Sequence, residues 1–454
     1  MHTRDSLAAA AELLAQSEGS LAWLDAGPSA ASGSSYLIVP AAREHRLTAN
    51  VRTGLVVERG DSEAESAELS WTGDIFTALR DRWQPSAGTD DTAQFSGGWV
   101  GWIGYECATD SLHIPMASSS AEYPDAAWFR AGAWARLDHA TDTLRVEGTD
   151  ATARERLTKA LSSAAPSAAA SPGMDRPLHA AWRDRPERYA EQVRAAQALI
   201  ADGEAYQLCL TSQVSGHEPL DAFAVYRDLR AAAPSHHGSF IRVGDTALAS
   251  ASPEQFLELT PSGRLSSKPI KGTRRRGTDP HEDEALAHEL QQSEKERAEN
   301  VMIVDLMRND LGRLAVTGSV SVPSLLQVES YAPVHQLVST IRAQIDPAVH
   351  PIDAVRAAFP AGSMTGAPKH RAVTRLQELE SGPRGIYSGA HGYLSDDGSL
   401  DLAMTIRTIV MRPDGWAIGA GGGITSLSIP DDEVAEAQLK ARALLTVIRA
   451  ENRD

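Results

Sequence analysis

Helical periodicity marks three stretches of the 454-residue chain. Apolar residues recur every three or four positions in Ala190 to Ile200 and in Ala435 to Arg449, which predicts two amphipathic helices. Near the N-terminus, Leu7 to Ala15 is apolar but is interrupted by the charged Glu12. Because no cluster of basic residues precedes this stretch, we interpret it as an amphipathic helix and not as a secretory signal.

Short apolar runs bounded by turn residues predict strands on both sides of the chain's midpoint. They are Ser35 to Val39, Trp99 to Ile103, Trp134 to Leu137, Ala247 to Ser250, Ile406 to Met411 and Trp416 to Ala420. No internal repeat is visible. Strands and helices are interspersed without the regular alternation of a doubly wound sheet, so the pattern favours a mixed α+β fold.

A low-complexity stretch divides the chain in two. Residues 161–177 are rich in Ala, Ser and Pro, contain the pair Pro172-Gly173, and show no apolar periodicity. Such a composition is typical of a surface loop or linker. We therefore expect an N-terminal region over residues 1–160 and a second region, with most of the candidate chemistry, over residues 178–454.

Composition and charge exclude several classes of protein. The chain is 42% hydrophobic and 23% charged, as in ordinary globular proteins, and no apolar run approaches the roughly 20 residues that cross a bilayer. A net charge of −17 repels phosphate backbones and anionic membranes, which argues against nucleic-acid and membrane binding. Cys107 and Cys209 are the only cysteines, too few for a disulfide framework or a zinc cluster. These features favour a cytoplasmic protein.

Two residues beyond the linker are candidates for acid–base and nucleophilic chemistry. Glu254 follows a predicted strand and the rigid Pro253, and it can act as a general acid if burial raises its pKa. Lys271, between Ile270 and Gly272, can be a partly desolvated amine and hence a nucleophile. The alternatives are a solvated turn glutamate and an exposed loop lysine, which are the more common environments of such residues.

Four glutamates have the spacing of a metal site. Glu296 and Glu299 are three residues apart in a helical segment, and Glu433, Glu436 and Lys440 share one face of the C-terminal helix. One or two carboxylates commonly hold Mg²⁺, with substrate oxygens and waters as the remaining ligands. Two such pairs brought together would suit Mg²⁺ bound to a substrate carboxylate. Spacing alone leaves open the usual alternative, a solvated helix face.

Glycine-rich and cationic segments complete the candidate site. They are Pro269 to Thr273, Gly362 to Lys369, Tyr387 to Gly389, Ile406 to Thr408 and Gly419 to Gly423. Consecutive glycines leave backbone N–H groups free to face an anion, and arginine can bind a carboxylate through two hydrogen bonds. Each segment alone can also be a tight turn. No phosphate-binding glycine motif is present, so a nucleotide is not the implied ligand.

Taken together, several of these segments resemble the signatures of one family. Glu299 to Leu311, Pro269 to Thr273, Ala361 to Lys369 and Ala420 to Ile424 are similar to those of the chorismate-utilising enzymes, which make anthranilate, 4-amino-4-deoxychorismate, isochorismate or salicylate. The resemblance covers Ala190 to Ala450, and before the linker it rests on Gly97 to Glu106. It implies the fold of anthranilate synthase component I, in which two antiparallel sheets face each other and helices pack outside.

The resemblance also implies roles for individual residues. Glu299 and Glu436 match Mg²⁺ ligands, with Glu296 and Glu433 beside them, and Glu254 matches the acid that protonates the leaving C4 hydroxyl of chorismate. Positions matching substrate contacts are Gly272, Thr273, His335, Thr365, Tyr387, Arg407, Gly421, Gly422, Gly423 and Lys440. For His335, a packed structural histidine is the alternative.

Two positions distinguish reactions within the family. Members that add water carry a lysine base where this chain has Gln207, and glutamine cannot accept a proton from water near neutral pH. Members that place an amino group on C4 share Lys271, whereas those that make anthranilate have alanine there. The resemblance thus implies that Lys271 attacks C2 and that ammonia then adds at C4, towards 4-aminobenzoate and folate. Anthranilate formation is the alternative, and a catalytically inactive ligand-binding homologue is a remote one.

The source of ammonia is predicted to be another protein. A glutaminase needs a nucleophilic cysteine on a sharp turn with a partnering histidine. Cys209 lies in a strand-like run, and no glycine-rich turn surrounds Cys107. We therefore expect a separate glutamine amidotransferase subunit as partner, besides the small molecules chorismate and ammonia.

Overall fold

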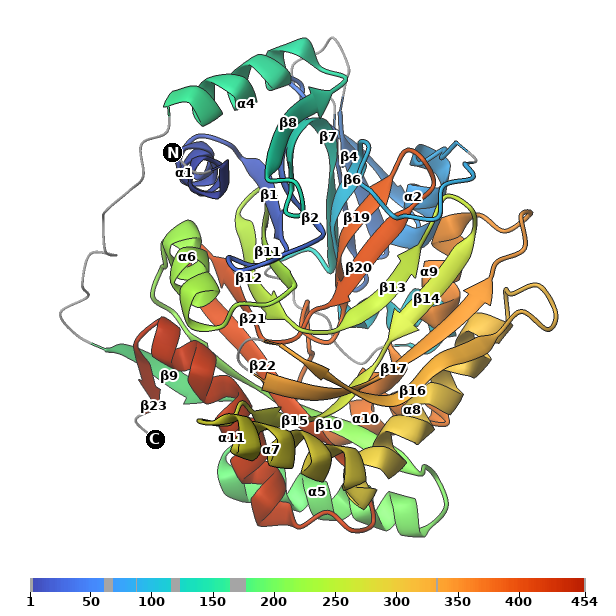
Figure 1. Cartoon of the computed structure of the whole chain (residues 1–454). Helices are drawn as coiled ribbons and strands as arrows, with labels where there is room; N and C mark the ends of the chain where they lie inside the picture. The colour runs from blue at the N-terminus through green and yellow to red at the C-terminus, as the bar shows by residue number, and fades with distance from the viewer. Residues whose placement is uncertain are drawn as a thin grey trace.

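Two antiparallel sheets form the centre of the molecule (Figure 1). This computed structural model describes residues 3–60, 68–86, 88–115, 123–163, 177–331 and 334–452. In the first sheet the strand order is β8 (Thr143–Gly148), β7 (Ala126–Asp138), β2 (Ser34–Pro40), β1 (Ser20–Asp25), β11 (His237–Val243), β12 (Thr246–Ser252), β21 (Thr408–Arg412), β22 (Gly415–Ile424) and β10 (Gln207–Gly216). Strands β9 (Leu178–Trp182) and β18 (Gly366–Ala367) also pair with β10.

The second sheet shares strand β7 with the first. Its order is β5 (Glu68–Thr72), β4 (Leu55–Arg59), β3 (Arg46–Asn50), β7, β6 (Gly98–Ile103), β19 (Ala390–Ser395), β20 (Leu400–Met404), β13 (Gln255–Leu259), β14 (Arg264–Lys268) and β17 (Val334–Gln344). Strands β15 (Ile270–Arg275) and β16 (Ser321–Ser330) both pair with β17, and β23 (Ala450–Asn452) runs parallel to β9. Residues 126–130 of β7 pair within the second sheet, and residues 131–138 pair within the first.

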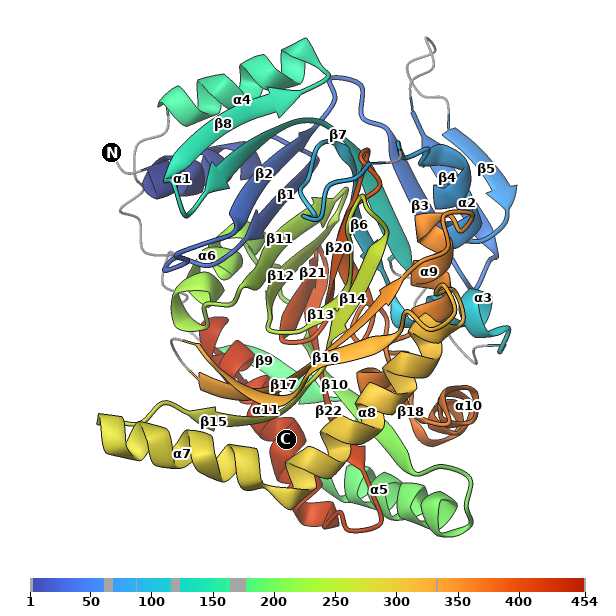
Figure 2. The same cartoon turned by 45° about the vertical axis from the view of Figure 1, so that its right-hand side comes forward.

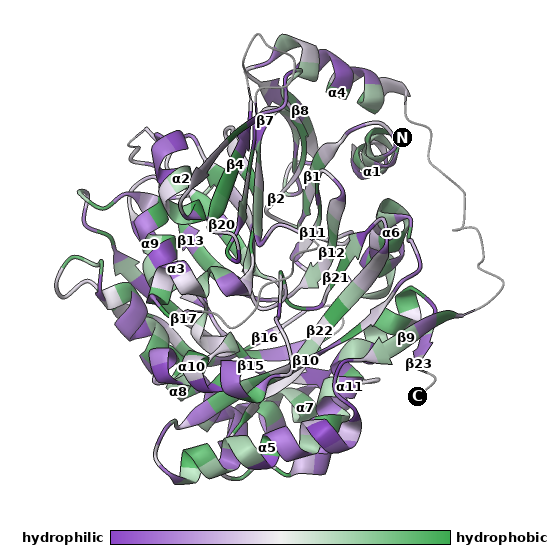
Figure 3. Ribbon diagram, turned by 180° about the vertical axis from the view of Figure 1, so that it is seen from behind, coloured by the Kyte–Doolittle hydropathy of each residue, from purple (hydrophilic) through white to green (hydrophobic). Residues whose placement is uncertain are grey.

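Helices surround the sheets (Figures 1 and 2). They are α1 (Thr3–Ala15), α2 (Ile75–Arg82), α3 (Ala108–Leu112), α4 (Ala151–Ser163), α5 (Pro186–Ala201), α6 (Ala222–Ala232), α7 (Pro280–Gln292), α8 (Glu294–Gly312), α9 (Pro351–Ala358), α10 (Lys369–Leu379) and α11 (Pro430–Val447), with two 3₁₀ turns, η1 (Tyr105–Cys107) and η2 (Gly362–Met364). The helices carry both hydrophilic and hydrophobic segments, as expected for amphipathic helices (Figure 3). No helix in the described ranges is long and apolar enough to span a membrane.

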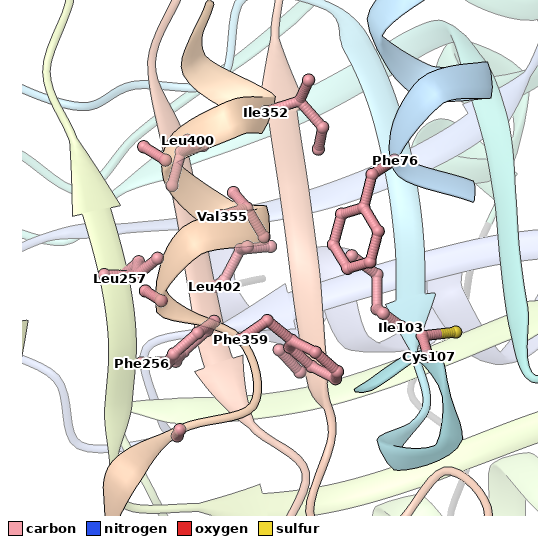
Figure 4. Close-up of a cluster of buried hydrophobic side chains, with 14 of the residues drawn as sticks. Phe76, Ile103, Cys107, Phe256, Leu257, Ile352, Val355, Phe359, Leu400 and Leu402 are labelled. Atoms are coloured by element: carbon pink, nitrogen blue, oxygen red, sulfur yellow. The ribbon is translucent and has the colours of Figure 1, made fainter. Parts of the chain in front are cut away.

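Side-chain alternation along the strands builds three apolar layers. Val100 and Trp102 of β6 pack between the sheets, whereas Trp99 and Ile103 of the same strand face outwards. Helices α2, α8 and α9 pack on the outer face of the second sheet, and α1, α4, α6 and α11 pack on the first. In Figure 4, Phe76 of α2 and Val355 of α9 lie over this outer face. The predicted fold, two facing antiparallel sheets with helices outside, is therefore confirmed.

The predicted elements occur with small shifts at their ends. Helix α11 begins five residues before the predicted Ala435 and ends at Val447. Strand β21 begins at Thr408, two residues after the predicted start, because Arg407 has a left-handed backbone (φ 49°) that interrupts the strand. Helix α4 extends to Ser163, three residues into the predicted linker, and residues 164–176 of that linker lie outside the described part of the chain.

Candidate active site

Four glutamates from two helices gather at one end of the sheets. Glu296 and Glu299 lie in the first two turns of α8, and Glu433 and Glu436 lie in the first two turns of α11. Helix α11 approaches closely because Gly422 of β22 has no side chain. A Cβ atom at Gly422 would lie 2.9 Å from Oε2 of Glu433 and 3.7 Å from Oε1 of Glu436. The ends of both glutamate side chains therefore lie against the backbone of β22 at Gly422, where a larger residue would displace them.

Each glutamate has a polar partner of its own. Nζ of Lys271 lies 4.0 Å from Oε2 of Glu299, and Nζ of Lys440 lies 2.7 Å from Oε1 of Glu436. The Lys440 ammonium also donates to the carbonyl of Gly421 at 2.7 Å. The remaining contacts are Arg274 to Glu296 at 3.7 Å and the Ser428 hydroxyl to Glu433 at 2.7 Å.

The carboxylates raise one another's proton affinity. Burial raises the pKa of Glu299, and the charges of Glu296 and Glu436 add to this shift. Burial likewise raises the pKa of Glu433, with a further contribution from Glu436. Burial opposes ionisation of Glu436 too, but the ion pair with Lys440 prevails and lowers its pKa. The cluster thus concentrates negative charge that requires nearby cations.

A lysine not singled out from the sequence supplies part of that charge. Lys295 is attracted by Glu299, Glu433, Glu436 and Glu296, and this attraction outweighs burial and raises its pKa. It stands in the first turn of α8, where the helix dipole disfavours a cation. A lysine in the first turn of a helix was the feature by which the sequence could have indicated Lys295 as a site residue. Only the fold shows which carboxylates stabilise its charge.

The donor chemistry of the cluster suits Mg²⁺. Carboxylate oxygens are the protein ligands that this ion prefers, and a divalent cation would favour the charged forms of Glu299 and Glu433, whose pKa values are raised by burial and, to a smaller extent, by the neighbouring carboxylates. As the side chains stand in the described residues, no three His, Cys, Asp or Glu groups are arranged closely enough to hold a metal ion. Binding would therefore require the carboxylates to exchange lysine partners for the metal.

Glu254 lies between β12 and β13, close to Lys271. Its side chain is buried, and its backbone carbonyl accepts a hydrogen bond from the N–H of Met404 at 3.0 Å. Burial raises the pKa of Glu254 to about 7, against the opposing effects of the Ser363 hydroxyl, the Lys271 charge and the Ile270 backbone. A carboxyl group with this pKa is half protonated near neutral pH and can act as a general acid. The environment is therefore the buried one, and not the solvated turn.

Lys271 reaches the cluster from β15. Its side chain is 15% exposed, so most of it is surrounded by protein. The next residue, Gly272, has φ 81°, and a Cβ atom there would lie 3.0 Å from the side chain of Glu296. Its left-handed backbone favours glycine at this position, and a Cβ atom would also lie 2.8 Å from the Leu290 side chain of α7. Gly272 thus lies beside Glu296, and its role as a contact of the substrate stays a prediction.

Arg407 lines a cavity between the two sheets whose wall includes Pro253, next to Glu254. The cavity has a volume of about 860 Å³, and its walls include Tyr36, Gln336, His391 and Asp401. Burial lowers the pKa of the Arg407 guanidinium, and no carboxylate among the described residues forms an ion pair with it. An unpaired, partly enclosed arginine is suited to binding an anionic ligand.

The other predicted contacts lie on strands and turns beside the cluster. Tyr387 is buried next to Ser388, whose backbone is left-handed (φ 65°). Thr365 is fully buried, and its hydroxyl donates to the carbonyls of Ala361 and Gly362. Thr273 lies in β15 opposite Gln336. Gly421, Gly422 and Gly423 pair with Thr211, Leu210 and Cys209 of β10, the strand that begins at Gln207.

His335 is not brought to the glutamate cluster. Its Nδ1 atom lies 2.7 Å from the Ser330 hydroxyl and its Nε2 atom lies 2.9 Å from Oδ1 of Asp283, so both ring nitrogens have partners on the α7 side of β17. The adjacent Gln336 points the other way, into the cavity. This geometry favours a packed structural histidine. Side chains alternate between the two faces of a strand, so His335 and Gln336 point in opposite directions. To predict which of them faces the cavity, one must know how β17 is placed in the sheet.

Comparison with known proteins identifies the family. Residues 43–446 match the family described as chorismate binding enzyme. The chain is 42% identical over 418 residues to an aminodeoxychorismate synthase of Streptomyces griseus, covering 88% of this chain and 56% of that protein. It is 39% identical to anthranilate synthase component 1 of Streptomyces coelicolor, covering 83% of this chain and 78% of that protein.

A solved structure gives the same answer for the fold. The crystal structure of anthranilate synthase component I from Streptococcus pneumoniae TIGR4 superposes with a TM-score of 0.78 at 29% identity, covering 92% of this chain and 93% of that one. The chain belongs to the chorismate-binding enzymes. It spans about half the length of several curated aminodeoxychorismate synthases that it matches.

Proposed function

We propose that the chain is the chorismate-aminating part of an aminodeoxychorismate synthase, which forms 4-amino-4-deoxychorismate for 4-aminobenzoate and folate synthesis. The observation that carries the proposal is the 42% identity to two Streptomyces aminodeoxychorismate synthases over most of this chain. The position of Lys271, 4.0 Å from Glu299 and near the buried Glu254, supports it. An amine and an acid so placed can act on C2 and on the C4 hydroxyl of chorismate, the two ends of one allylic system.

In this proposal Glu296, Glu299, Glu433 and Glu436 hold Mg²⁺. The ion would neutralise a carboxylate of chorismate and so allow an anionic substrate to approach an acidic cluster. Lys440 would bind substrate from α11, and Arg407 would bind a second anionic group. The strongly negative chain makes such local cations necessary, because its overall field repels the dianionic substrate.

The chemical step is assigned to two residues. The unprotonated amine of Lys271 forms a bond to C2 of chorismate while the double bond shifts and the C4–O bond breaks, and protonated Glu254 gives its proton to the departing oxygen, so that water leaves. Ammonia then bonds to C4, the double bond shifts back, and the C2–N bond to Lys271 breaks. The lysine is regenerated, and Glu254 recovers a proton as the product ammonium loses one.

Ammonia is proposed to come from a glutamine amidotransferase. Both cysteines of the chain are buried, and burial raises the pKa of Cys107 and of Cys209. A buried, protonated thiol is a poor nucleophile. This supports a glutaminase outside the chain, which we expect to act in the cytoplasm together with it.

Anthranilate synthase component I is the second candidate. The 39% identity to the Streptomyces coelicolor enzyme, over a larger share of that protein's length, favours it. The two candidates differ in where nitrogen is attached, so product analysis separates them.

The decisive experiment incubates the purified chain with chorismate, Mg²⁺ and either an ammonium salt or glutamine. We expect 4-amino-4-deoxychorismate from the ammonium salt and no product from glutamine until a cognate amidotransferase is added. Anthranilate as the main product would establish the second candidate, and glutamine-driven turnover by the chain alone would refute the separate glutaminase.

A further inference from the structure

A fully buried arginine lies beneath the predicted substrate segments. Arg384, between α10 and β19, has a side chain that is 1% exposed. Its guanidinium donates five hydrogen bonds: Nε and Nη2 to the Glu380 carboxylate at 2.9 and 2.7 Å, Nη2 to the carbonyl of Cys209 at 2.7 Å, and Nη1 to the carbonyl of Met364 at 2.7 Å and the hydroxyl of Ser388 at 3.4 Å. All five N–H donors of the guanidinium are therefore used.

These partners lie next to the predicted contacts of the substrate. Met364 precedes Thr365, and Ser388 follows Tyr387. The N–H of Cys209 donates to the carbonyl of Thr365 at 2.7 Å, which ties β10 to the same point. One rigid, planar group thus joins its own segment, which includes Ser388, to the turn at Met364 and to β10 at Cys209.

Two residues of the N-terminal region, Tyr105 and Glu106, also contact Arg384 and the residue that follows it. The guanidinium carbon of Arg384 lies 4.1 Å from the centre of the Tyr105 ring. The backbone N–H of Arg384 donates to Oε1 of Glu106 at 2.8 Å, and the N–H of Tyr105 donates to the carbonyl of Gly385 at 2.8 Å. Tyr105 and Glu106 end the segment Gly97 to Glu106, which was singled out from the sequence and has no part in the proposed chemistry.

The charges of this cluster balance without solvent. Burial raises the pKa of Glu106 to about 8, which favours its protonated form near pH 7, and Glu380 is the carboxylate that pairs with Arg384. Glu380 is held in turn by the N–H and hydroxyl of Thr211 at 2.9 and 3.0 Å. A buried ion pair adds little net stability because both ions lose their hydration. The importance of the Arg384–Glu380 pair therefore lies in the chain segments that its hydrogen bonds hold in place.

We propose that Arg384 is a positioning residue that acts through Thr365 and Tyr387, and that Tyr105 and Glu106 complete its setting. This inference rests on the proposed function, because Thr365 and Tyr387 contact chorismate only there. Without the guanidinium, the three segments lose their common anchor while the carboxylate cluster and Lys271 keep their own contacts. The deficit is therefore expected in substrate binding more than in the chemical step.

The test compares Arg384→Lys with a matched control. Lysine has three donors and cannot form the fork that joins Glu380, Met364 and Cys209. We expect the KM for chorismate to rise about 10-fold to 100-fold, with a smaller change in kcat, since displacements near 1 Å carry penalties of this size. Arg230→Lys is the control: Arg230 also bonds a carboxylate, Asp25, and lies 4.7 Å from the Trp23 ring, away from the glutamate cluster. Its KM should equal that of the wild type.

A second variant covers the case in which Arg384→Lys does not fold. Tyr105→Leu removes the ring beneath the guanidinium and leaves all five hydrogen bonds, so we expect a smaller rise in KM at nearly unchanged kcat. An unchanged KM in Tyr105→Leu and in folded Arg384→Lys, with normal wild-type turnover, rejects the inference alone. A wild-type chain that does not turn over chorismate rejects the proposed function and the inference with it.

Discussion

Lys271 of β15 and Glu254, between β12 and β13, meet in a site where protein surrounds both side chains. The proposed covalent step makes Lys271→Ala the most informative substitution. We expect formation of 4-amino-4-deoxychorismate to fall at least roughly 100-fold, as for the loss of other covalent nucleophiles. Unfolding free energy should fall as well, by up to about 3 kcal/mol, because Glu299 loses a cation in a largely enclosed site; turnover is therefore compared at a temperature at which the variant is folded.

Mass spectrometry supplies the complementary measurement. Wild-type protein quenched with chorismate in the absence of ammonia should carry an adduct on Lys271, and Lys271→Arg, which keeps the charge, should carry none. A Lys271→Ala variant that makes the 4-amino product at the wild-type rate would exclude the covalent role and leave the proposed reaction standing.

The raised pKa of Glu254 predicts a pH dependence at the same scale. Since the acid form donates the proton, turnover should decline as the pH rises above about 7. Glu254→Gln should lower turnover about 10²-fold to 10⁴-fold and remove this limb of the profile.

The buried Glu254 that is proposed to serve catalysis should lower the stability of the folded protein as the pH rises. The folded pKa lies above the unfolded value of 4.5, so the folded state retains a proton that the unfolded chain has released, and wild-type stability is lost as the pH rises from about 4.5 to 7. Glu254→Gln should therefore gain in Tm relative to the wild type between pH 5 and pH 8. A constant Tm difference over this range would contradict a protonated, buried Glu254.

At the scale of elements, α8 and α11 place two carboxylates each on facing turns, which predicts a response to Mg²⁺ that does not depend on turnover. The ion should raise the Tm of the wild type, since a ligand at 100 times its Kd stabilises by about 2.7 kcal/mol. Glu299→Gln and Glu436→Gln should abolish both this shift and turnover. Asp305→Asn, in the exposed ion pair of α8 with Arg308, is the control and should keep both. Full activity in excess chelator would refute the metal.

Periodicity predicted α1, α5 and α11, because an amphipathic stripe is a local property, but α2, α4, α6, α7, α9 and α10 were not predicted from the sequence. It could predict neither strand partners nor orientation. The distinction between His335 and Gln336 depends on the register of β17 against β15, and the burial of Arg384 depends on Tyr105, some 280 residues away. The spacing of Glu296, Glu299, Glu433 and Glu436 placed each pair on one helix face, but the proximity of the two pairs depends on how α8 and α11 pack in the fold. Such long-range contacts leave no periodic signal in the sequence.

At the scale of the whole molecule, the two regions on either side of the linker are not separate in the sheets. Strand β1 pairs with β11, and β6 pairs with β19, so each sheet contains strands from both regions. The division at residues 161–177 therefore stays a prediction about the linker, and the described residues show a core that neither region completes alone. The substrate segments and the Tyr105 motif belong to one packing unit.

The pairing of Ile103 with Ala390 also limits how early β6 can complete its pairing during protein synthesis. Strand β6 is made early, but about 290 residues of chain must follow before β19 exists to cover its edge. At about 5–20 residues per second, a ribosome needs roughly 15–60 s for that length. During this time Trp99 and Trp102 belong to a nascent strand with one uncovered edge, which is the kind of surface that chaperones bind and that aggregates nucleate on. A lower growth temperature and a larger supply of chaperones should thus raise the yield of folded protein, because both limit aggregation of the nascent chain.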